Sequence, residues 1–475
     1  METMTSQSSR VLGEATLAEL RTRMLGSMVS PGDSGYEDAR QIWNRAIDRH
    51  PVLVLRCSGV ADVISGLQFA CSEGLPVAIR GGGHSIAGFS TCDGGVVLDL
   101  SAMAAVRVDP RNRRAFAQGG ATWRQFDHET QAHGLATTGG QVSSTGIGGF
   151  TLGGGIGYLV RKHGLTCDNL LSAEMVTAEG ELVRASEDQN TDLFWALRGG
   201  GGNFGVVTEL EFALHSVGPG ILGGAVFYPG QRAAQVLASW RDAVAGAPDD
   251  LATVVNLTTA PAAPFLPEDL HGKKVVALAV CWAGPLEEGE EVVRPLRALG
   301  TPLADLLGPI PYVALQQLID PVWEPGAANY FTSAFLDELP DPAVETLADA
   351  HRRSAGLPAT CELHLSQLGG AMARTASGAT AFSQRQSPYL INCVARTPTA
   401  EGFEANRAWA RGTRDSMARF GTGQMYVNYT GEGDEDKVRA SYPAETYARL
   451  AAVKAHYDPV NRFRFNQNIR PAQAG

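Results

Sequence analysis

Residues 80–85 read Arg-Gly-Gly-Gly-His-Ser and directly follow the apolar run Val-Ala-Ile at residues 77–79. Three successive residues without side chains let backbone N–H groups point inward and hold an anion such as a pyrophosphate. The residue behind these glycines is His84, whose imidazole is a nucleophile near neutral pH. A strand, a bare turn and a nucleophile in this order indicate a loop that binds a phosphate-bearing cofactor.

A second glycine-rich segment precedes the other candidate nucleophile. Residues 146–157 are mostly glycine and show neither a strand nor a helix period, so their backbone can approach a ligand closely. Residues 164–169 then read Gly-Leu-Thr-Cys-Asp-Asn, and a thiol is the strongest protein nucleophile once ionised. His84 and Cys167 together predict a cofactor that is both cradled and covalently attached. The alternative for either residue is a packed side chain without chemistry, which is the common role of a buried cysteine.

The composition restricts the classes of partner. The chain has 475 residues, enough for about two or three domains, and its net charge is −11, whereas nucleic acids and anionic membranes require a basic face. No apolar run approaches the ~20 residues that span a bilayer, and residues 1–10 lack the apolar core of a secretory signal. The seven cysteines include no Cys-x-x-Cys pair, so neither a disulfide framework nor a metal site is expected. We therefore expect a cytoplasmic protein that acts on a small molecule without nucleic acid, membrane or metal; the oligomeric state stays open.

The apolar pattern changes after Pro219. Before this residue the sequence predicts short strands and helices, with a hairpin over residues 174–186 that turns at Glu179-Gly180. After it, longer strands alternate with helices such as residues 231–245 and 342–353, which predicts a sheet with helices on one face. The strands predicted before Pro219 are residues 52–55, 77–79, 96–100, 106–108, 115–118 and 206–214, and those predicted after it are residues 222–228, 275–282, 330–335, 361–365, 389–395 and 424–429.

Several common catalytic and nucleotide-binding motifs are missing or misplaced. No glycine loop ends in Gly-Lys-Ser/Thr, and no Gly-x-Ser-x-Gly elbow occurs. A Gly-x-Gly-x-x-Gly pattern at residues 200–205 follows a helix-like segment and precedes a strand, the reverse of the dinucleotide-binding context. His128 and His133 are spaced for different helix faces, which excludes a zinc-protease motif.

The combination of segments resembles one family. Residues 80–85, 146–157 and 167–169, the run Leu-Arg-Gly-Gly-Gly-Gly-Asn-Phe-Gly-Val-Val-Thr at 197–208 and the segment Tyr-Asp-Pro-Val-Asn-Arg-Phe-Arg-Phe-Asn-Gln-Asn-Ile at 457–469 occur in this order. They are similar to the FAD-linked oxidases of the berberine-bridge-enzyme family, which have the vanillyl-alcohol-oxidase flavin fold. The resemblance covers about residues 45–471.

The resemblance implies an α+β, two-domain PCMH-type FAD-binding fold. It divides the chain into a lead-in (1–45), an FAD-binding domain (46–218), a substrate-binding domain (219–430) and a C-terminal segment that returns to the FAD domain (431–475). The substrate domain is expected to be an antiparallel sheet covered by helices.

The resemblance also implies how the flavin is held. His84 matches the histidine joined to the 8α-methyl carbon, and Cys167 matches the cysteine joined to C6 in members with two attachments. Thr145 falls where relatives place a residue that controls oxygen access, and its small side chain favours an oxidase. The residues implied to bind the cofactor are His84, Cys167, Arg80, Gly81, Gly82, Gly83, Ser85, Ser144, Thr145, Gly146, Gly149, Gly154, Gly157, Val207, Asn466 and Asn468.

For the catalytic residues, the resemblance points to two strands that face the flavin. Asn392 stands where some members carry a glutamate base, and because asparagine takes up no proton at neutral pH, the base role passes to a tyrosine. Strand alternation would put Tyr426 and Tyr429 on opposite faces, and we predict Tyr429 as the base, with a pKa depressed by a hydrogen bond from Asn392. The alternative for both tyrosines is ordinary packing, which fits Tyr426 better. Substrate contacts are predicted at His364, Gln367 and Tyr426, and rim positions are the alternative for the first two.

These inferences predict an oxidase with FAD attached through His84 and Cys167. It would oxidise a CH–OH group of a sugar or a glycosylated or polyketide-type natural product and reduce O2 to H2O2. The alternatives are a dehydrogenase of the same fold with another acceptor, an enzyme that forms C–C or C–N bonds oxidatively, and a flavin-binding protein without catalysis. The substrate class rests on analogy between folds alone.

Overall fold

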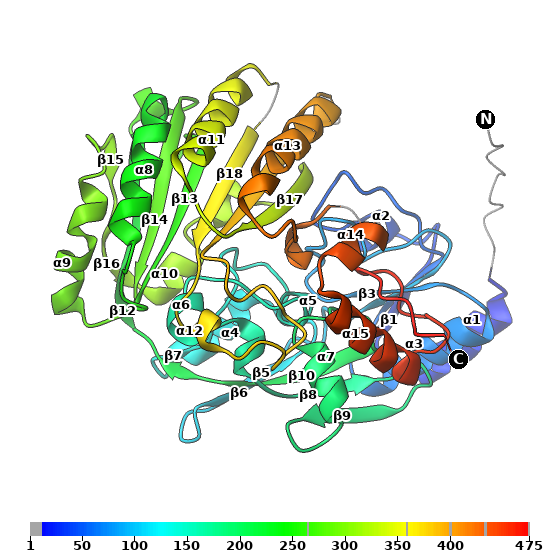
Figure 1. Cartoon of the computed structure of the whole chain (residues 1–475). Helices are drawn as coiled ribbons and strands as arrows, with labels where there is room; N and C mark the ends of the chain where they lie inside the picture. Colours follow the sequence, from blue (N-terminus) through cyan, green and yellow to red (C-terminus); the bar gives the residue numbers. More distant parts are fainter. Residues whose placement is uncertain (1–11, 264–265, 358–359, 399–400, 432–434, 474–475) are drawn as a thin grey trace.

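The computed structural model describes residues 12–263, 266–357, 360–398, 401–431 and 435–473. The described chain forms an N-terminal domain with two main sheets and a second domain built around one large sheet (Figure 1). The C-terminal segment lies against the N-terminal domain.

The first sheet of the N-terminal domain positions the loop that carries His84. Three of its four strands are parallel, in the order β2-β4-β3, and β1 pairs with β2 antiparallel at the edge. Helix α3 (Val60–Ser72) packs closely on this sheet because Gly66 has no side chain: a Cβ there would lie 2.7 Å from Leu98 and 2.8 Å from Leu55. The strands are β1 (Ser27–Val29), β2 (Leu53–Arg56), β3 (Val77–Arg80) and β4 (Val96–Asp99).

The second sheet is antiparallel, with the strand order β5-β6-β10-β8-β9. Helices α4 (Trp123–Gln131) and α7 (Thr191–Leu197) pack on it through a core that includes Trp123, Phe126, Phe194 and Phe212. The strands are β5 (Val106–Asp109), β6 (Arg114–Gln118), β8 (Leu170–Val176), β9 (Leu182–Ser186) and β10 (Val206–Ala213), and a small separate pair joins β7 (Leu135–Ala136) to β11 (His215–Ser216).

The second domain is an antiparallel sheet with the main strand order β15-β12-β14-β13-β18-β19-β17. Helices cover its outer face, and the alternate side chains of the strands form one large core with them (Figure 1). The opposite face of the sheet is turned toward the N-terminal domain. The strands are β12 (Gly220–Pro229), β13 (Leu251–Thr259), β14 (Lys274–Trp282), β15 (Ala304–Asp305), β16 (Gly308–Pro311), β17 (Ala328–Leu336), β18 (Thr360–Gln367) and β19 (Tyr389–Thr397), and the covering helices are α8 (Ala233–Val244), α9 (Leu286–Arg297), α11 (Asp341–Arg353) and α13 (Phe403–Met417).

The segment before residue 46 is integrated with both domains. It includes α1 (Glu14–Arg23), β1 and α2 (Tyr36–Arg40), and Asn44 follows it. The Asn44 amide donates hydrogen bonds to the carbonyl oxygens of Ile86, at 2.7 Å, and of Asn329 in β17, at 2.9 Å. Its own oxygen accepts the Asn329 N–H at 2.8 Å, so one buried side chain joins the two domains.

A buried ion pair shapes the C-terminal segment. Helix α15 (Ala444–Tyr457) packs near α7, and Lys454 Nζ lies 2.6 Å from Asp458 Oδ2, with both side chains fully buried. Lys454 also donates to the carbonyl oxygens of Asn203 and Phe463, and Asp458 accepts the Phe463 N–H. With every polar group of the pair satisfied, the chain beyond Asp458 is fixed as it runs toward Asn466.

Most elements predicted from periodicity are present, and two predictions are wrong. Residues 424–429 form no strand; Val427–Tyr429 is a turn of 3₁₀ helix instead. Residues 146–157, predicted without regular structure, contain the short helix α5 (Ile147–Leu152), which tertiary packing stabilises despite its glycines. The hairpin at Glu179-Gly180 is confirmed by the pairing of β8 with β9. Within the described ranges, no helix has both the length and the apolar character needed to cross a membrane.

Candidate active site

A large cavity lies between the loops of the N-terminal domain and the inner face of the second sheet. We call the first side the glycine wall; it consists of bare backbone at Gly81, Gly82, Gly83, Gly119, Gly146, Gly148 and Gly149. We call the opposite side the strand wall; it consists of the side chains of Trp323, Phe331, His364, Asn392 and Tyr429. The two walls come from parts of the sequence more than 150 residues apart, which only the tertiary fold brings together.

The glycine wall depends on two loops that touch through their main chains. A Cβ built on Gly82 would lie 2.4 Å from the backbone nitrogen of Gly146, closer than real contacts allow, so both positions require glycine. Gly83 has φ of +70°, a conformation that glycine adopts without strain. Asn466 and Gln467 complete this side from the C-terminal segment, and their buried oxygens Oδ1 and Oε1 have no hydrogen-bond partner among the described residues.

His84 lies beside the glycine wall in a setting that favours a nucleophile. Its ring stacks on that of Trp43, with centroids 4.9 Å apart and planes 18° from parallel, and its Nε2 is 2.9 Å from Ser144 Oγ. Burial lowers the pKa of His84 to about 4, because a charged imidazolium would lose its hydration. The ring is therefore neutral at physiological pH and retains a lone pair for bond formation.

The strand wall follows from alternation along three neighbouring strands. His364 in β18 pairs in register with Asn392 in β19, which pairs with Ser333 in β17, so these residues share the inner face. Phe331, two residues before Ser333, adds an aromatic ring to this face. The centroid of the Trp323 ring lies 5.7 Å from that of the Phe331 ring. The Oδ1 of Asn392 is buried without a hydrogen-bond partner among the described residues, so the wall offers an unused acceptor.

Tyr429 reaches the cavity from the 3₁₀ turn rather than from a strand. Its ring meets Phe331 edge-on at 6.2 Å and Tyr426 at 5.0 Å. Burial raises the pKa of Tyr429 to about 12, so its hydroxyl remains protonated at neutral pH. The depressed pKa predicted for Tyr429 is therefore wrong, and its protonated hydroxyl is available to donate a hydrogen bond.

Two predicted substrate contacts face away from the cavity. The Tyr426 hydroxyl accepts the backbone N–H groups of Gly155, at 2.9 Å, and Ile156, at 3.2 Å, in a fully buried position. Gln367 accepts a hydrogen bond from Thr253 and donates one to the carbonyl of Val244 in α8. Gln367 is an odd number of residues from His364, so alternation places it on the helix-covered face. Both predictions are corrected, and only His364 of the predicted substrate residues lines the cavity.

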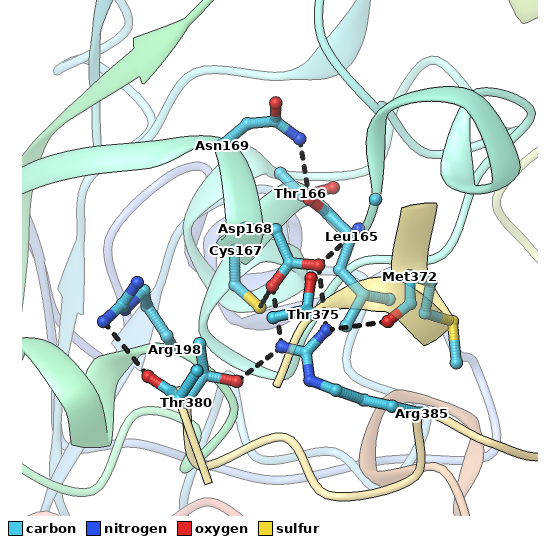
Figure 2. Close-up of polar contacts among 12 residues, drawn as sticks. Leu165, Thr166, Cys167, Asp168, Asn169, Arg198, Met372, Thr375, Thr380 and Arg385 are labelled. Carbon is cyan, nitrogen blue, oxygen red and sulfur yellow. Dashed lines mark hydrogen bonds and ion pairs between the residues drawn. The ribbon is translucent and has the colours of Figure 1, made fainter. Parts of the chain in front are cut away.

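Cys167 lies outside the cavity lining. Its fully buried side chain belongs to an apolar cluster with Ile156, Leu165, Met372 and Phe382. Figure 2 shows the thiol beside Asp168. Burial, followed by the charge of Asp168, holds the pKa of the Cys167 thiol well above its usual range. Cys167 is thus not among the residues that line the cavity, although Tyr429, which lines it, packs against the same apolar cluster. The second flavin attachment at Cys167 stays a prediction.

The loop around Cys167 is held by a buried ion pair. Arg385 donates to both carboxylate oxygens of Asp168, at 2.7 and 3.0 Å, and also to Thr380 Oγ1 and the Met372 carbonyl (Figure 2). The Asp168 carboxylate in turn accepts the backbone N–H of Leu165 at 2.9 Å. This bidentate pair explains the Cys-Asp-Asn sequence in structural terms, with Asp168 as its central residue.

The remaining cofactor residues divide into two groups. The residues that line the cavity as predicted are Gly81, Gly82, Gly83, His84, Ser85, Thr145, Gly146, Gly149, Val207 and Asn466. Arg80 instead pairs with Asp99 at 3.3 Å, Gly154 lies against Phe382, and Gly157 backs onto the Gly139 carbonyl, so these three are structural. Ser144 contributes through His84, and the buried Oδ1 of Asn468 has no partner among the described residues.

Sequence reasoning missed the aromatic part of the site. Trp43 and Trp323 lie outside regular strands and helices, so no periodicity marks them as cavity residues. Phe331 lies within a predicted strand. That its side chain is on the same face of the sheet as Asn392 follows only from the register of the two strands. Tryptophan within a polar loop was the available signal.

Comparison with known proteins identifies the relatives of this arrangement. The FAD-binding-domain family matches residues 51–186, and the berberine and berberine-like family matches residues 425–470. (R)-6-hydroxynicotine oxidase of Paenarthrobacter nicotinovorans is 31% identical over 461 residues, which cover 94% of this chain and 97% of that protein. The solved structure of 6-hydroxy-D-nicotine oxidase from Arthrobacter nicotinovorans has a TM-score of 0.85 at 30% identity and covers 94% of this chain and 98% of its own. Glucooligosaccharide oxidase of Acremonium strictum shares the fold, with a TM-score of 0.85 at 23% identity over 97% and 99% of the two chains.

The fold and these matches define a flavin-dependent oxidoreductase. The chain belongs to the berberine-bridge-enzyme-like family of FAD-linked oxidoreductases. The family, the α+β fold and the enzymatic class predicted from the sequence are confirmed.

Proposed function

We propose that this enzyme is an oxidase that holds FAD through a single covalent bond at His84 and oxidises a CH–OH group of a ring-bearing natural product. The observation that carries this proposal is the pairing of a neutral, buried histidine on the glycine wall with an aromatic wall that contains only a few polar groups. The first wall suits a cofactor with phosphate groups, and the second suits a hydroxylated ring system.

The residues present fit FAD. The close main-chain approach at Gly82 and Gly146 leaves backbone exposed where side chains would fill the space, and the unpartnered oxygens of Asn466 and Gln467 can accept hydrogen bonds from a bound group. His84 would hold the flavin, and Thr145 would line its surroundings. The chemistry that bound FAD supplies is acceptance of a hydride from the substrate carbon and return of the electrons to O2 as H2O2.

The residues of the strand wall position the substrate. Trp323 and Phe331 offer faces and edges for stacking and exclude water from the reacting carbon. Tyr429, protonated at neutral pH, donates a hydrogen bond, and the free Oδ1 of Asn392 accepts one. A hydroxyl group on the substrate can use both partners, which fixes the orientation of its C–H bond.

The aromatic character of the wall favours a glycosylated or polyketide-type ring system over a free sugar. Four of the strand wall's five side chains are aromatic rings or imidazole, which can pack against the rings of such a compound. One relative is named (R)-6-hydroxynicotine oxidase, and the substrate in that name contains rings. A dehydrogenase of the same fold with another electron acceptor is the second candidate, as is oxidative C–C or C–N bond formation.

A substrate panel tests the proposal. The purified holoenzyme is mixed in air with glucose, cellobiose, benzyl alcohol, 4-methoxybenzyl alcohol and 6-hydroxynicotine, and flavin bleaching and peroxide are recorded. We expect bleaching by an aromatic compound, followed by reoxidation in air with release of peroxide. Bleaching that persists in air would exclude an oxidase and favour the dehydrogenase. Fastest reduction by glucose or cellobiose would exclude the proposed substrate class.

A further inference from the structure

A buried carboxylate outside the cavity lining pairs with the histidine of the strand wall. Glu362 and His364 are two residues apart in β18, so alternation puts them on the same face of the sheet. Glu362 Oε2 lies 2.9 Å from His364 Nε2, and Glu362 Oε1 accepts a hydrogen bond from Thr258 at 2.7 Å. Both oxygens of this carboxylate are thus engaged, and the histidine orientation is fixed from below the cavity.

The charge state of Glu362 follows from these contacts. Burial raises the pKa of this carboxyl group, but the hydrogen bond and electrostatic attraction from His364, the hydrogen bond from Thr258 and the charge of Arg396 outweigh burial and leave the pKa below its usual value. Glu362 is therefore ionised, and an ionised carboxylate at Nε2 requires a proton on that nitrogen. Nδ1 is the other ring nitrogen, and within the described residues it has no hydrogen bond.

His364 is also connected to His84 through aromatic rings. Trp43 stacks on His84 at 4.9 Å and meets Trp323 at 6.2 Å, and Trp323 meets His364 edge-on at 5.7 Å. All four rings line the same cavity. A substrate between the two walls therefore lies within reach of His364, whose side chain is 20% exposed.

The surrounding groups leave His364 as the proton acceptor. Arg396 and Lys274 are cations near Glu362, and burial lowers the pKa of both without removing their charge. His351 is kept neutral by burial, which lowers its pKa to about 4. Tyr429 retains its proton, and Asn392, opposite His364, takes none up.

We propose that His364 is the catalytic base of this enzyme and that Glu362 is its positioning residue. As the hydride leaves the substrate carbon for the flavin, the substrate O–H bond breaks. Its electron pair forms the C=O bond, and its proton moves to Nδ1 of His364. The ionised Glu362 stabilises the resulting imidazolium, and the proton is given up when O2 is reduced to H2O2. The role of His364 as the base rests on the proposed function. The position of the proton in the Glu362–His364 dyad does not, because it can be measured without substrate.

The first test requires no substrate. In holoenzyme labelled with ¹⁵N-histidine, the His364 signal is assigned by its loss in His364→Gln, and two-bond ¹H–¹⁵N correlations report which ring nitrogen carries the proton. We expect the proton on Nε2 in the unmodified enzyme and a titration midpoint that moves to lower pH in Glu362→Gln, because that variant removes the negative charge beside the ring. Glu211→Gln is the matched control, because Glu211 is a buried, ion-paired glutamate of the other domain. A proton on Nδ1, or the same midpoint in Glu362→Gln, would overturn the proposal.

The second test is kinetic and uses the compound of the panel that bleaches the flavin fastest. His364→Gln should lower the rate of anaerobic flavin reduction by about 10²-fold or more and remove the acidic limb of its pH profile. Glu362→Gln should keep that limb but shift it to lower pH, whereas a merely structural role would change only the melting temperature. An unchanged acidic limb in His364→Gln refutes the base assignment. A panel in which nothing bleaches the flavin would instead contradict the proposed function, and the NMR result would still decide the dyad.

Discussion

On the glycine wall a ligand meets main chain, whereas on the strand wall it meets side chains from three neighbouring strands and from the segments that contain Trp323 and Tyr429. A single added carbon alters the first wall: at Gly82 it would lie 2.4 Å from a backbone atom of Gly146. The second wall can exchange side chains without moving its backbone, because the sheet is held from its other face by the helix-covered core. Under the proposed function, the cofactor side of the cavity would tolerate little change, and substrate specificity would be set on the strand wall.

The largest effect is expected from Gly82→Ala. The new Cβ forces the loops at Gly82 and Gly146 apart, so the variant should lose all bound flavin and emerge colourless. The measurement is the visible spectrum of the purified protein, with circular dichroism to verify that it is folded. Gly412→Ala in α13 is the matched control, because a Cβ there meets nothing within 4 Å. A folded Gly82→Ala variant that remains yellow would contradict the claim that the glycine wall must lack a side chain at Gly82 to hold the flavin.

His84→Ala should remove the covalent attachment while leaving the glycine wall intact. The expected result is flavin in the supernatant after acid precipitation, whereas the unmodified protein precipitates yellow and its mass exceeds that of the polypeptide by one FAD. The reason is that His84 lies beside the glycine wall as a neutral imidazole, with a pKa lowered to about 4. Flavin that stays with precipitated His84→Ala would show that another residue forms the bond.

On the strand wall, Tyr429→Phe should have a moderate effect. Removing one hydrogen-bond donor is expected to lower kcat/KM by about 3- to 10-fold. The pH profile of kcat/KM should stay the same through the neutral range. The pKa of about 12 keeps the Tyr429 hydroxyl protonated throughout that range, so it contributes no ionisation there. Loss of an ionisation near neutral pH in this variant would restore Tyr429 as the base.

The smallest effect is expected from Cys167→Ala. The thiol lies in an apolar cluster outside the cavity, so the attached flavin mass and kcat should match those of the unmodified enzyme. The free energy of unfolding should fall by about 1 kcal/mol, from the small gap that the sulfur leaves. A variant with the usual mass but a flavin spectrum shifted relative to the unmodified enzyme would place the sulfur on the ring after all.

The sequence predicts the two walls to different extents. The segment from Gly81 to His84 could be recognised as a ligand-binding loop from the sequence. Consecutive glycines indicate an unusual backbone conformation or a close approach of the backbone to another group. The sequence could not place Cys167 relative to the cavity, because proximity to a glycine loop along the chain does not determine which way a side chain points. The Asp168–Arg385 pair, 217 residues apart, orients that loop. No local pattern contains such a contact.

The alternation of side chains along a strand explains the other correct and incorrect predictions of cavity residues. His364 and Gln367 were both predicted to contact substrate, but an odd separation in a strand puts their side chains on opposite faces. Tyr426 and Tyr429 were separated correctly for an incorrect reason, since the segment is a 3₁₀ turn and not a strand. The turn follows from contacts with the N-terminal domain, such as the bonds from Gly155 and Ile156 to Tyr426, which the local sequence does not encode.

Asn44 has a consequence for the spacing of the two walls. Its side chain makes one hydrogen bond to the loop at Ile86 and two to Asn329 in β17, so a hinge motion that parted the domains would have to break the two bonds to Asn329 in the protein interior. These bonds oppose widening of the cavity between the domains, so a substrate has to fit a gap whose width the lead-in segment helps to set.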